Sequence, residues 1–207
     1  MRVTLLAIAM AGCTAPPASS LTPTVSAYDE LSRLYINTFL ASGDPDVEID
    51  ATFRGKTVQV LHDSTGSYFG VIELATPLTT DESLRVTVDG VATTMTAPAA
   101  FDMVDVPLFI SRTQDSTISW SPATAEPLRW DVLDSNCVRG AGGDIPGNAT
   151  SLTFNATDWT AQTNKQTDTC TSEVLLRRER TTPAPAAFAG GTLTFYREAD
   201  LQFASTP

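Results

Sequence analysis

The sequence predicts an all-β protein with two short antiparallel β-sandwiches behind a signal peptide and a flexible tether. Three observations support this prediction. Apolar and polar residues alternate with period two over most of the chain after residue 46, as expected for half-buried strands. The alternating runs are short. They are separated by turn residues such as Asp89-Gly90, and short strands between frequent turns are typical of β-sandwiches.

The first twelve residues have the pattern of a signal peptide. A short cationic start, Met1-Arg2, precedes an apolar run over residues 3–11 that is too short to cross a bilayer core of about 30 Å. Met10-Ala11-Gly12-Cys13 follows and resembles the lipobox of bacterial lipoproteins, with Met10 in place of the commoner Leu. The resemblance implies a diacylglycerol on the thiol of Cys13 and a further acyl chain, such as palmitate, on its amine. The alternative is an ordinary secretory signal with an unrelated cysteine.

Residues 13–25 are predicted to tether the folded body to the membrane. "TAPPASSLTPT" is rich in Pro, Ser and Thr and lacks apolar periodicity. Two or three acyl chains on Cys13 would anchor the chain firmly, because each buried CH₂ contributes about 0.8 kcal/mol. Thr14 stands where, by resemblance to enteric lipoproteins, Asp would favour retention in the inner membrane. We therefore expect a location in the cell envelope, at the outer membrane, facing either the periplasm or the cell surface.

Residues 26–98 are predicted to form the first sandwich. In "VEIDATFR", Val47, Ile49, Ala51 and Phe53 share one face, and "TVQVLH", "YFGVIEL" and "LRVTV" continue the alternation as antiparallel strands. Asp89-Gly90 predicts a type I′ hairpin before "VATTMT", because that turn needs positive φ. "AYDELSRLYINTFLAS" fits both helical and strand spacing, so residues 28–40 are ambiguous. We favour a strand there, because the neighbouring runs are all strand-like.

Residues 99–207 are predicted to form the second sandwich, after a junction at "TAPAAFDMVDVP". Its strand runs are "STISWSP", "LRWDVL", "SLTFNA", "SEVLLRRER" and "GTLTFYREADLQF". The apolar positions of these runs give the expected core: Trp120, Leu128, Trp130, Val132, Leu152, Phe154, Val174, Leu176, Leu193 and Phe195.

The run "TISWSP", in which Trp120 precedes Pro122 at the end of an alternating strand, resembles the early strand of immunoglobulin-like (Ig-like) and fibronectin type III (FN3) modules. The resemblance covers about residues 100–207 and implies an Ig-like sandwich. The first half resembles the same class only through its strand pattern.

The chain contains three cysteines, Cys13, Cys137 and Cys170. If Cys13 is acylated, the other two remain as one pair in an oxidising compartment. We expect a Cys137–Cys170 disulfide that holds the Gly-rich region "VRGAGGDIPGNAT" and stabilises the fold by about 3–4 kcal/mol. Two buried thiols are the alternative.

The charge and the residue patterns argue against several functions. A net charge of −11 argues against a nucleic-acid partner, because phosphate binding depends on Lys and Arg. "HDS" at residues 62–64 has the residue types of a catalytic triad, but adjacent strand residues point to opposite faces. We expect His62 to lie on the inward face with Val58 and Val60. The sequence contains no recognisable catalytic, cofactor-binding or metal-binding set, so we expect no enzymatic activity, no cofactor and no metal.

Arg177, Arg178 and Arg180 in "LLRRER" are interpreted as solvated strand positions that offset the acidic excess. Together with the predicted anchor, the fold class favours a non-catalytic binding or adhesion module with a protein or glycan partner. The alternative is a structural accessory subunit of a periplasmic or outer-membrane assembly.

Replacing Cys13 by Ala is expected to release the protein from the membrane, because acylation requires the thiol. When cells that express the Cys13→Ala variant are fractionated, we expect the protein in the soluble fraction and not in the membrane fraction. A variant that still sediments with membranes would contradict the predicted anchor.

Overall fold

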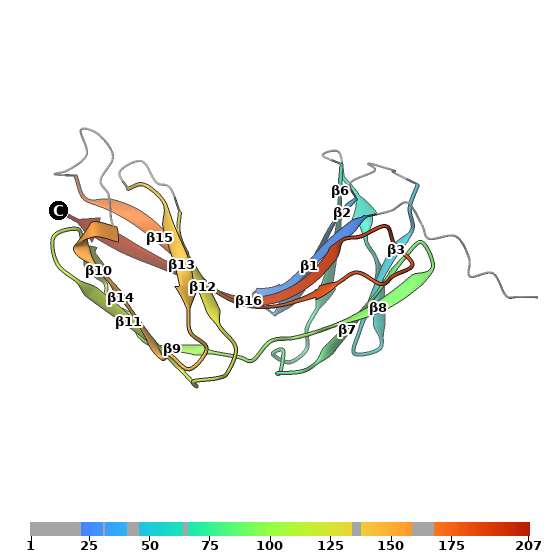
Figure 1. Cartoon of the computed structure of the whole chain (residues 1–207), viewed down its shortest axis with the longest axis horizontal. Coiled ribbons are helices and arrows are strands. Elements are labelled where there is room, and N and C mark those ends of the chain that lie inside the picture. The colour runs from blue at the N-terminus through green and yellow to red at the C-terminus, as the bar shows by residue number, and fades with distance from the viewer. Residues whose placement is uncertain (1–21, 31, 41–45, 64–65, 134–137, 159–167) are drawn as a thin grey trace, which may run out of the picture.

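The computed structural model describes residues 22–30, 32–40, 46–63, 66–133, 138–158 and 168–207. Strands make up most of this part of the chain, and its only helical element is the 3₁₀ helix η1 (Ala156–Asp158). Within the same ranges, no helix has the length and apolar character to cross a bilayer. Figure 1 shows a U-shaped molecule with one sandwich in each arm. The predicted all-β sandwich fold is therefore confirmed.

Eight strands form most of the first sandwich, in the right-hand arm of Figure 1: β1 (Pro23–Glu30), β2 (Arg33–Leu40), β3 (Ile49–Phe53), β4 (Lys56–Gln59), β5 (Leu61–His62), β6 (Ser67–Glu73), β7 (Ser83–Val88) and β8 (Val91–Thr96). Six strands belong to the second: β9 (Asp102–Asp105), β10 (Phe109–Ser111), β11 (Ser116–Ser121), β12 (Leu128–Val132), β13 (Ala141–Ile145) and β14 (Ser151–Phe154). Two long strands, β15 (Cys170–Pro183) and β16 (Thr192–Thr206), form a hairpin that runs through both arms.

A nine-stranded sheet lines the inside of the U and belongs to both sandwiches. Its strands follow the order β13-β12-β15-β16-β1-β2-β6-β5, and β10 pairs with the far end of β16. β12 pairs with residues 174–178 of β15, whereas β1 pairs in parallel with residues 192–197 of β16. Because β15 and β16 are paired along their whole shared length, the sheet continues from one arm to the other.

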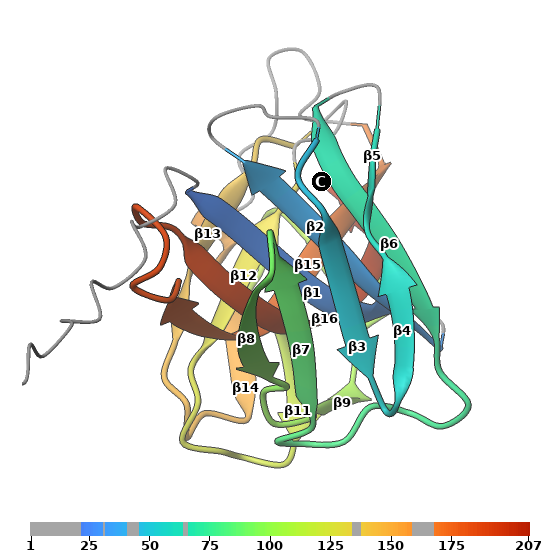
Figure 2. The ribbon, with the colours of Figure 1, turned by 90° about the vertical axis from the view of Figure 1, so that its right-hand side faces the viewer.

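Two smaller sheets pack separately on the outer side of this sheet. The sheet β4-β3-β7-β8 covers the first arm and appears as the front layer in Figure 2, and β14-β11-β9 covers the second arm. Each encloses its own hydrophobic core. The first core takes most of its residues from positions 25–97 and is completed by Phe188, Leu193 and Phe195 from the β15–β16 hairpin.

Local sequence explains most of the strands. Ile49, Ala51 and Phe53 are buried on one face of β3, as their alternation predicts. At the β7–β8 turn Asp89 and Gly90 have φ of 47° and 76°, so the predicted hairpin is confirmed.

The second sandwich has the strand order of an Ig-like module. β9, β11 and β14 form one sheet, and β12, β13, β15 and β16 belong to the other. Trp120 lies in β11, is 2% exposed and donates a hydrogen bond from Nε1 to the carbonyl of Ala149 (3.1 Å). Most residues of the predicted core are buried. Trp130 and Leu152 are half-buried at its margin and pack against the second core.

Three details differ from the sequence-based prediction. The preference for strand over helix in residues 28–40 is confirmed, but the segment belongs to two strands, β1 and β2, rather than one. β1 begins at Pro23 and Val25 is fully buried, so the tether predicted over residues 13–25 ends earlier. The first sandwich is not wholly antiparallel, because β1 and β16 run in parallel. All three differences have the same physical reason, which is that β1 pairs with β2 on one side and with the distant β16 on the other.

The division into residues 26–98 and 99–207 also changes at the C-terminus. Leu193 and Phe195 were expected in the second core, but they lie in the first core, on the part of β16 that pairs with β1. The hairpin therefore supplies strands to both sandwiches, and each sandwich contains residues from both halves of the chain.

Three arginines hold the two arms together beneath the hairpin. We call Arg178, Arg180 and Arg197, together with the connector of residues 97–101 that Arg178 and Arg197 bind, the arginine joint. Arg178 is fully buried, and its Nη1 donates to the carbonyls of Ala99 and Ala100 (3.1 Å each). Arg197 donates from Nε to Pro98 O (3.0 Å) and from Nη2 to Leu78 O (2.9 Å).

The expectation of solvated arginines is therefore wrong for Arg178. It lies on the inward face of β15, where the gap between the two cores leaves room for a guanidinium that satisfies connector carbonyls. Burial lowers the pKa of Arg178. Arg180 bonds to Glu126 of the second arm and to Asp81 of the first, so one side chain links both.

The loop before β7 is held by an ion pair between Arg54 and Glu82 (2.6 Å). Thr79 N also donates to Glu82 (2.6 Å). Hydrogen bonding from Arg54 is the largest cause that lowers the pKa of Glu82 from 4.5 to about 2. This loop carries Leu78 and Asp81, which bind the arginine joint.

We expect Glu82 to make the protein acid-sensitive. A carboxylate whose pKa is lowered by folding stabilises the fold above its unfolded pKa, and this contribution is lost as the pH falls from 4.5 to about 2. Glu82→Gln should lower the free energy of unfolding at pH 7 by about 1–3 kcal/mol and flatten its pH dependence in that range. Urea unfolding monitored at several pH values measures both effects. The exposed Glu48→Gln variant, on the same sandwich, should behave like the parent protein.

Candidate functional site

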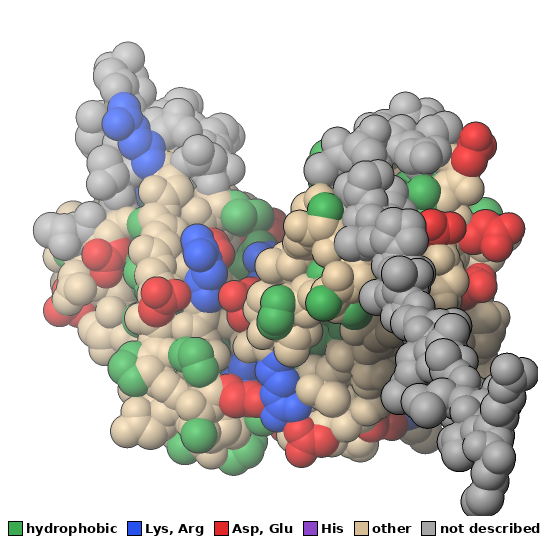
Figure 3. All heavy atoms as spheres, turned by 45° about the vertical axis from the view of Figure 1, so that its right-hand side comes forward, with side chains coloured by type: hydrophobic (Ala, Val, Ile, Leu, Met, Phe, Trp, Pro, Cys, Tyr) green, Lys and Arg blue, Asp and Glu red, His purple; other side chains and the backbone are tan. Residues whose placement is uncertain are grey.

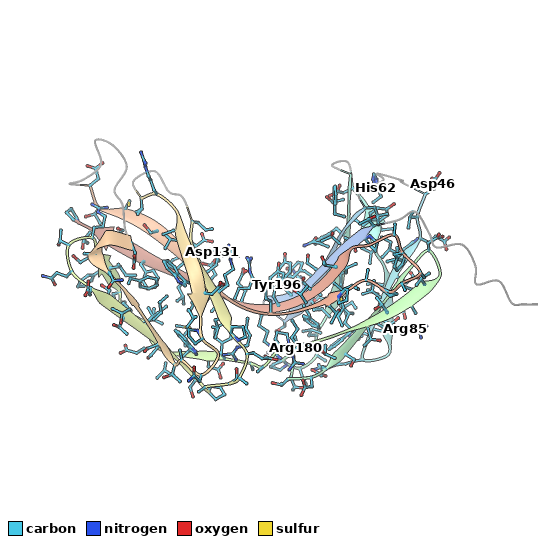
Figure 4. The ribbon with its side chains drawn as sticks, viewed as in Figure 1. Asp46, His62, Arg85, Asp131, Arg180 and Tyr196 are labelled. Carbon is cyan, nitrogen blue, oxygen red and sulfur yellow. The ribbon has the colours of Figure 1, made fainter. Side chains whose placement is uncertain are left out.

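The inner face of the nine-stranded sheet is the candidate functional site. Both smaller sheets cover the opposite face, so the inner face is open along both arms of the U. The space-filling view shows the recess between the two arms (Figure 3). In Figure 4 Tyr196 rises from the hairpin into this recess, whereas Arg180 points to the other side, into the joint.

A row of stacked aromatic rings crosses this face. Tyr196, Tyr28 and Tyr35 occupy aligned positions on β16, β1 and β2. The ring centroids of Tyr28 and Tyr196 are 5.0 Å apart, and those of Tyr28 and Tyr35 are 5.1 Å apart, with interplanar angles of 9° and 15°. We call these three residues the tyrosine ladder. Each ring is half-buried, so its edge is accessible from the recess.

The ladder continues into apolar side chains on the first arm. Phe69 on β6 packs against Tyr35 with a centroid distance of 6.0 Å. Phe69, Phe39 and Leu61 occupy outward positions of the same sheet and are 41%, 55% and 60% exposed. We call the ladder together with these three residues the aromatic wall.

An ion pair marks the boundary between the ladder and the second arm. The guanidinium of Arg177 lies over the ring of Tyr196 at 4.8 Å and pairs with Glu198 at 2.6 Å. Burial is the main cause that raises the pKa of Tyr196 to about 12, against the opposing effect of Arg177. The Tyr196 hydroxyl is therefore neutral, and it can both donate and accept a hydrogen bond at physiological pH.

The second arm presents mainly carboxylates to the recess. Six acidic residues lie at outward positions of β12, β13, β15 and β16, and we call them the acidic wall: Asp131, Asp144, Glu173, Glu179, Glu198 and Asp200. Two arginines, Arg129 and Arg177, lie among them in the described part of this face.

A shallow hollow of about 440 Å³ opens on the acidic wall. Residues lining it include Asp131, Leu175 and Arg177. Gly142 makes room for Asp131, because a Cβ at position 142 would lie 2.6 Å from the Oδ1 atom of Asp131. Figure 4 shows Asp131 on the side of the second arm that faces the recess.

Of the cysteines singled out from the sequence, Cys170 alone lies within the described residues. Cys13, the predicted lipidation site, and Cys137 lie outside the described residues, so the anchor and the Cys137–Cys170 disulfide stay predictions. Cys170 begins β15 and is half-buried, with its sulfur 3.9 Å from Nη1 of Arg112.

His62 lies on the predicted face: it pairs in register with the inward Tyr68, whereas the neighbouring Leu61 points outward with Phe69. It is nevertheless exposed, because β5 is the edge strand of the sheet. Its ring contacts that of Tyr68 edge-on, with centroids 5.0 Å apart. In the part of the chain that the structure describes, no three His, Cys, Asp or Glu side chains are arranged to hold a metal ion.

No protein-family model matches the chain, and no curated protein matches it in sequence. Solved structures with a similar arrangement include two from a cytokine receptor complex and the tandem Ig repeats of Dlar. The two receptor-complex chains have TM-scores of 0.30 and 0.29 at 12% and 13% identity, over 87% and 75% of this chain and 94% and 89% of theirs. The Dlar repeats have a TM-score of 0.31 at 12% identity, over 86% of this chain and 99% of theirs. At these scores the similarity supports no argument about ligand or activity.

We expect Tyr28, the central ring of the ladder, to stabilise the sheet as well as line the recess. Tyr28→Ala removes two stacked contacts and should lower the free energy of unfolding by about 2–3 kcal/mol. Tyr28→Phe keeps both contacts and should change it by less than about 0.5 kcal/mol. Urea unfolding followed by far-UV circular dichroism distinguishes the two. Equal losses in both variants would show that the hydroxyl, and not the stacking, is responsible.

Proposed function

We propose that the protein is a non-catalytic binding module, anchored through Cys13 at the outer membrane of the cell envelope, that holds a polypeptide partner in the recess of the U. The observation that carries the proposal is the aromatic wall. Its apolar side chains lie together on one open sheet face rather than singly, and such patches on soluble domains mark interaction sites.

The chemistry of the ladder supports a polypeptide partner over a glycan. Tyrosine provides a large, rigid and amphipathic contact surface, since few torsions must be fixed on binding. A sugar would stack on an open ring face, but both faces of Tyr28 are covered by Tyr35 and Tyr196. What the ladder offers is ring edges and, at Tyr196, a hydroxyl, which suit the side chains and backbone of a polypeptide.

A second surface supports the alternative of an accessory subunit in an envelope assembly. Val104, Val106, Leu108 and Phe109 are exposed along β9 and β10, and Leu108 is 88% exposed. In the described sheets β9 pairs only with β11, so its other edge is open to a further strand.

Crosslinking in intact cells tests the proposed function. A photoreactive benzoylphenylalanine in place of Phe69 keeps an aromatic residue on the aromatic wall. We expect it to form one discrete, protease-sensitive adduct. Tyr35→Ala in the same chain should reduce the adduct.

The matched control places the same photoreactive residue at Arg85, on the outer sheet of the first arm (Figure 4). It should form no comparable adduct. No adduct at position 69, or equal adducts at positions 69 and 85, would refute the proposed function. A third variant carries the photoreactive residue at Leu108. An adduct from this variant, without one from position 69, would favour the accessory-subunit alternative.

A further inference from the structure

The two arms of the recess differ in chemical character. At the described outward positions of β1, β2 and β6, the only charged side chains are Arg33 and Glu73, which pair with each other at 2.8 Å. The remainder of that face carries the aromatic wall and small polar residues. The second arm instead carries the acidic wall.

The acidic wall has a strong negative excess. Arg177 pairs with Glu198, and Arg129 pairs with Asp131 at 3.2 Å. This leaves Asp144, Glu173, Glu179 and Asp200 outside the ion pairs of the described residues, although Arg129 also interacts electrostatically with Asp144 and Glu179. Burial, and then the charges of Asp200 and Glu198, raise the pKa of Glu173.

A ligand that lies along the recess meets an apolar surface on one side and a negative surface on the other. In an extended polypeptide, successive side chains point to opposite sides, so each type of side chain can meet one wall. The segment that fits alternates apolar with cationic residues. Anionic partners are disfavoured because the acidic wall repels them.

We infer that the recess binds an extended, cationic polypeptide segment whose apolar side chains contact the aromatic wall and whose Lys or Arg side chains contact the acidic wall. This inference rests on the proposed function and adds the chemical class of the partner. The charge complementarity supplies partner selection, and the aromatic wall supplies apolar contact area.

Three synthetic ten-residue peptides test the inference with the purified full chain. The first alternates Leu with Lys, the second alternates Leu with Glu, and the third has five Leu followed by five Lys. We expect the alternating Leu-Lys peptide to bind about tenfold or more tightly than either of the others, by fluorescence anisotropy at moderate salt.

Two variants with the same loss of charge separate the acidic wall from the overall charge. Glu173→Gln with Asp200→Asn neutralises two carboxylates on the wall, whereas Glu48→Gln with Asp50→Asn neutralises two on the outer side of the first sandwich. We expect the first pair to weaken binding of the Leu-Lys peptide about tenfold, and the second to weaken it less than about twofold. Leu61→Ser, at an exposed position, tests the aromatic wall without disturbing the ladder and should weaken binding about threefold to tenfold.

Equal affinities for the three peptides, or equal effects of the two charge variants, would overturn the inference. If the adduct at position 69 forms in cells while the peptides are not discriminated, the proposed function holds and the partner has a different chemistry. If no adduct forms at position 69 and the peptides are not discriminated, the proposed function fails as well.

Discussion

Pairing of β15 with β16 along their whole shared length is the constraint on which the rest of the structure depends. One end of this hairpin completes the first core through Leu193 and Phe195, and the other end contributes Val174 and Leu176 to the second. Between the cores the inward face of the hairpin carries arginines in place of apolar side chains. Arg178 and Arg197 occupy that stretch and bind the carbonyls of the connector, so the joint is polar, buried and specific in geometry. Two buried nitrogens of Arg178, Nε and Nη2, have no hydrogen-bond partner among the described residues. Burying them costs free energy, which the surrounding contacts must offset.

The same hairpin determines where a ligand-binding surface can lie. Because both smaller sheets pack on one side of a continuous sheet, the other side remains uncovered, and the bend at the joint makes it a recess. Alternation along β16 sends Phe195 and Arg197 inward and Tyr196 and Glu198 outward, so the residues that hold the joint and those that line the recess come from the same few positions. The position of the recess and the residues of its floor are therefore both determined by the hairpin.

Local sequence predicts the strands but not their partners. Period-two alternation is a property of each segment, so the faces of β3, β7 and β11 follow from their own residues. The pairing of Tyr28 with Tyr196 joins segments that lie far apart in the sequence, and no local pattern encodes it. For this reason the sequence does not indicate that the three tyrosines form a ladder. The burial of Arg178 escapes prediction for a related reason. An arginine between two cores has the same neighbours in sequence as one in solvent, and only the connector that crosses beneath it makes it buried.

The parallel pairing of β1 with β16 also governs the order in which the chain can fold. Val25 and Ala27 reach their buried positions only when residues 192–197 lie beside them, and those residues follow much later in the chain. The first sandwich therefore cannot be completed until β16 has been synthesised, although most of its strands precede those of the second. Closing contacts between segments this far apart in the sequence has a loop-entropy cost, which slows folding. A chain interrupted before β16 would leave both sandwiches incomplete.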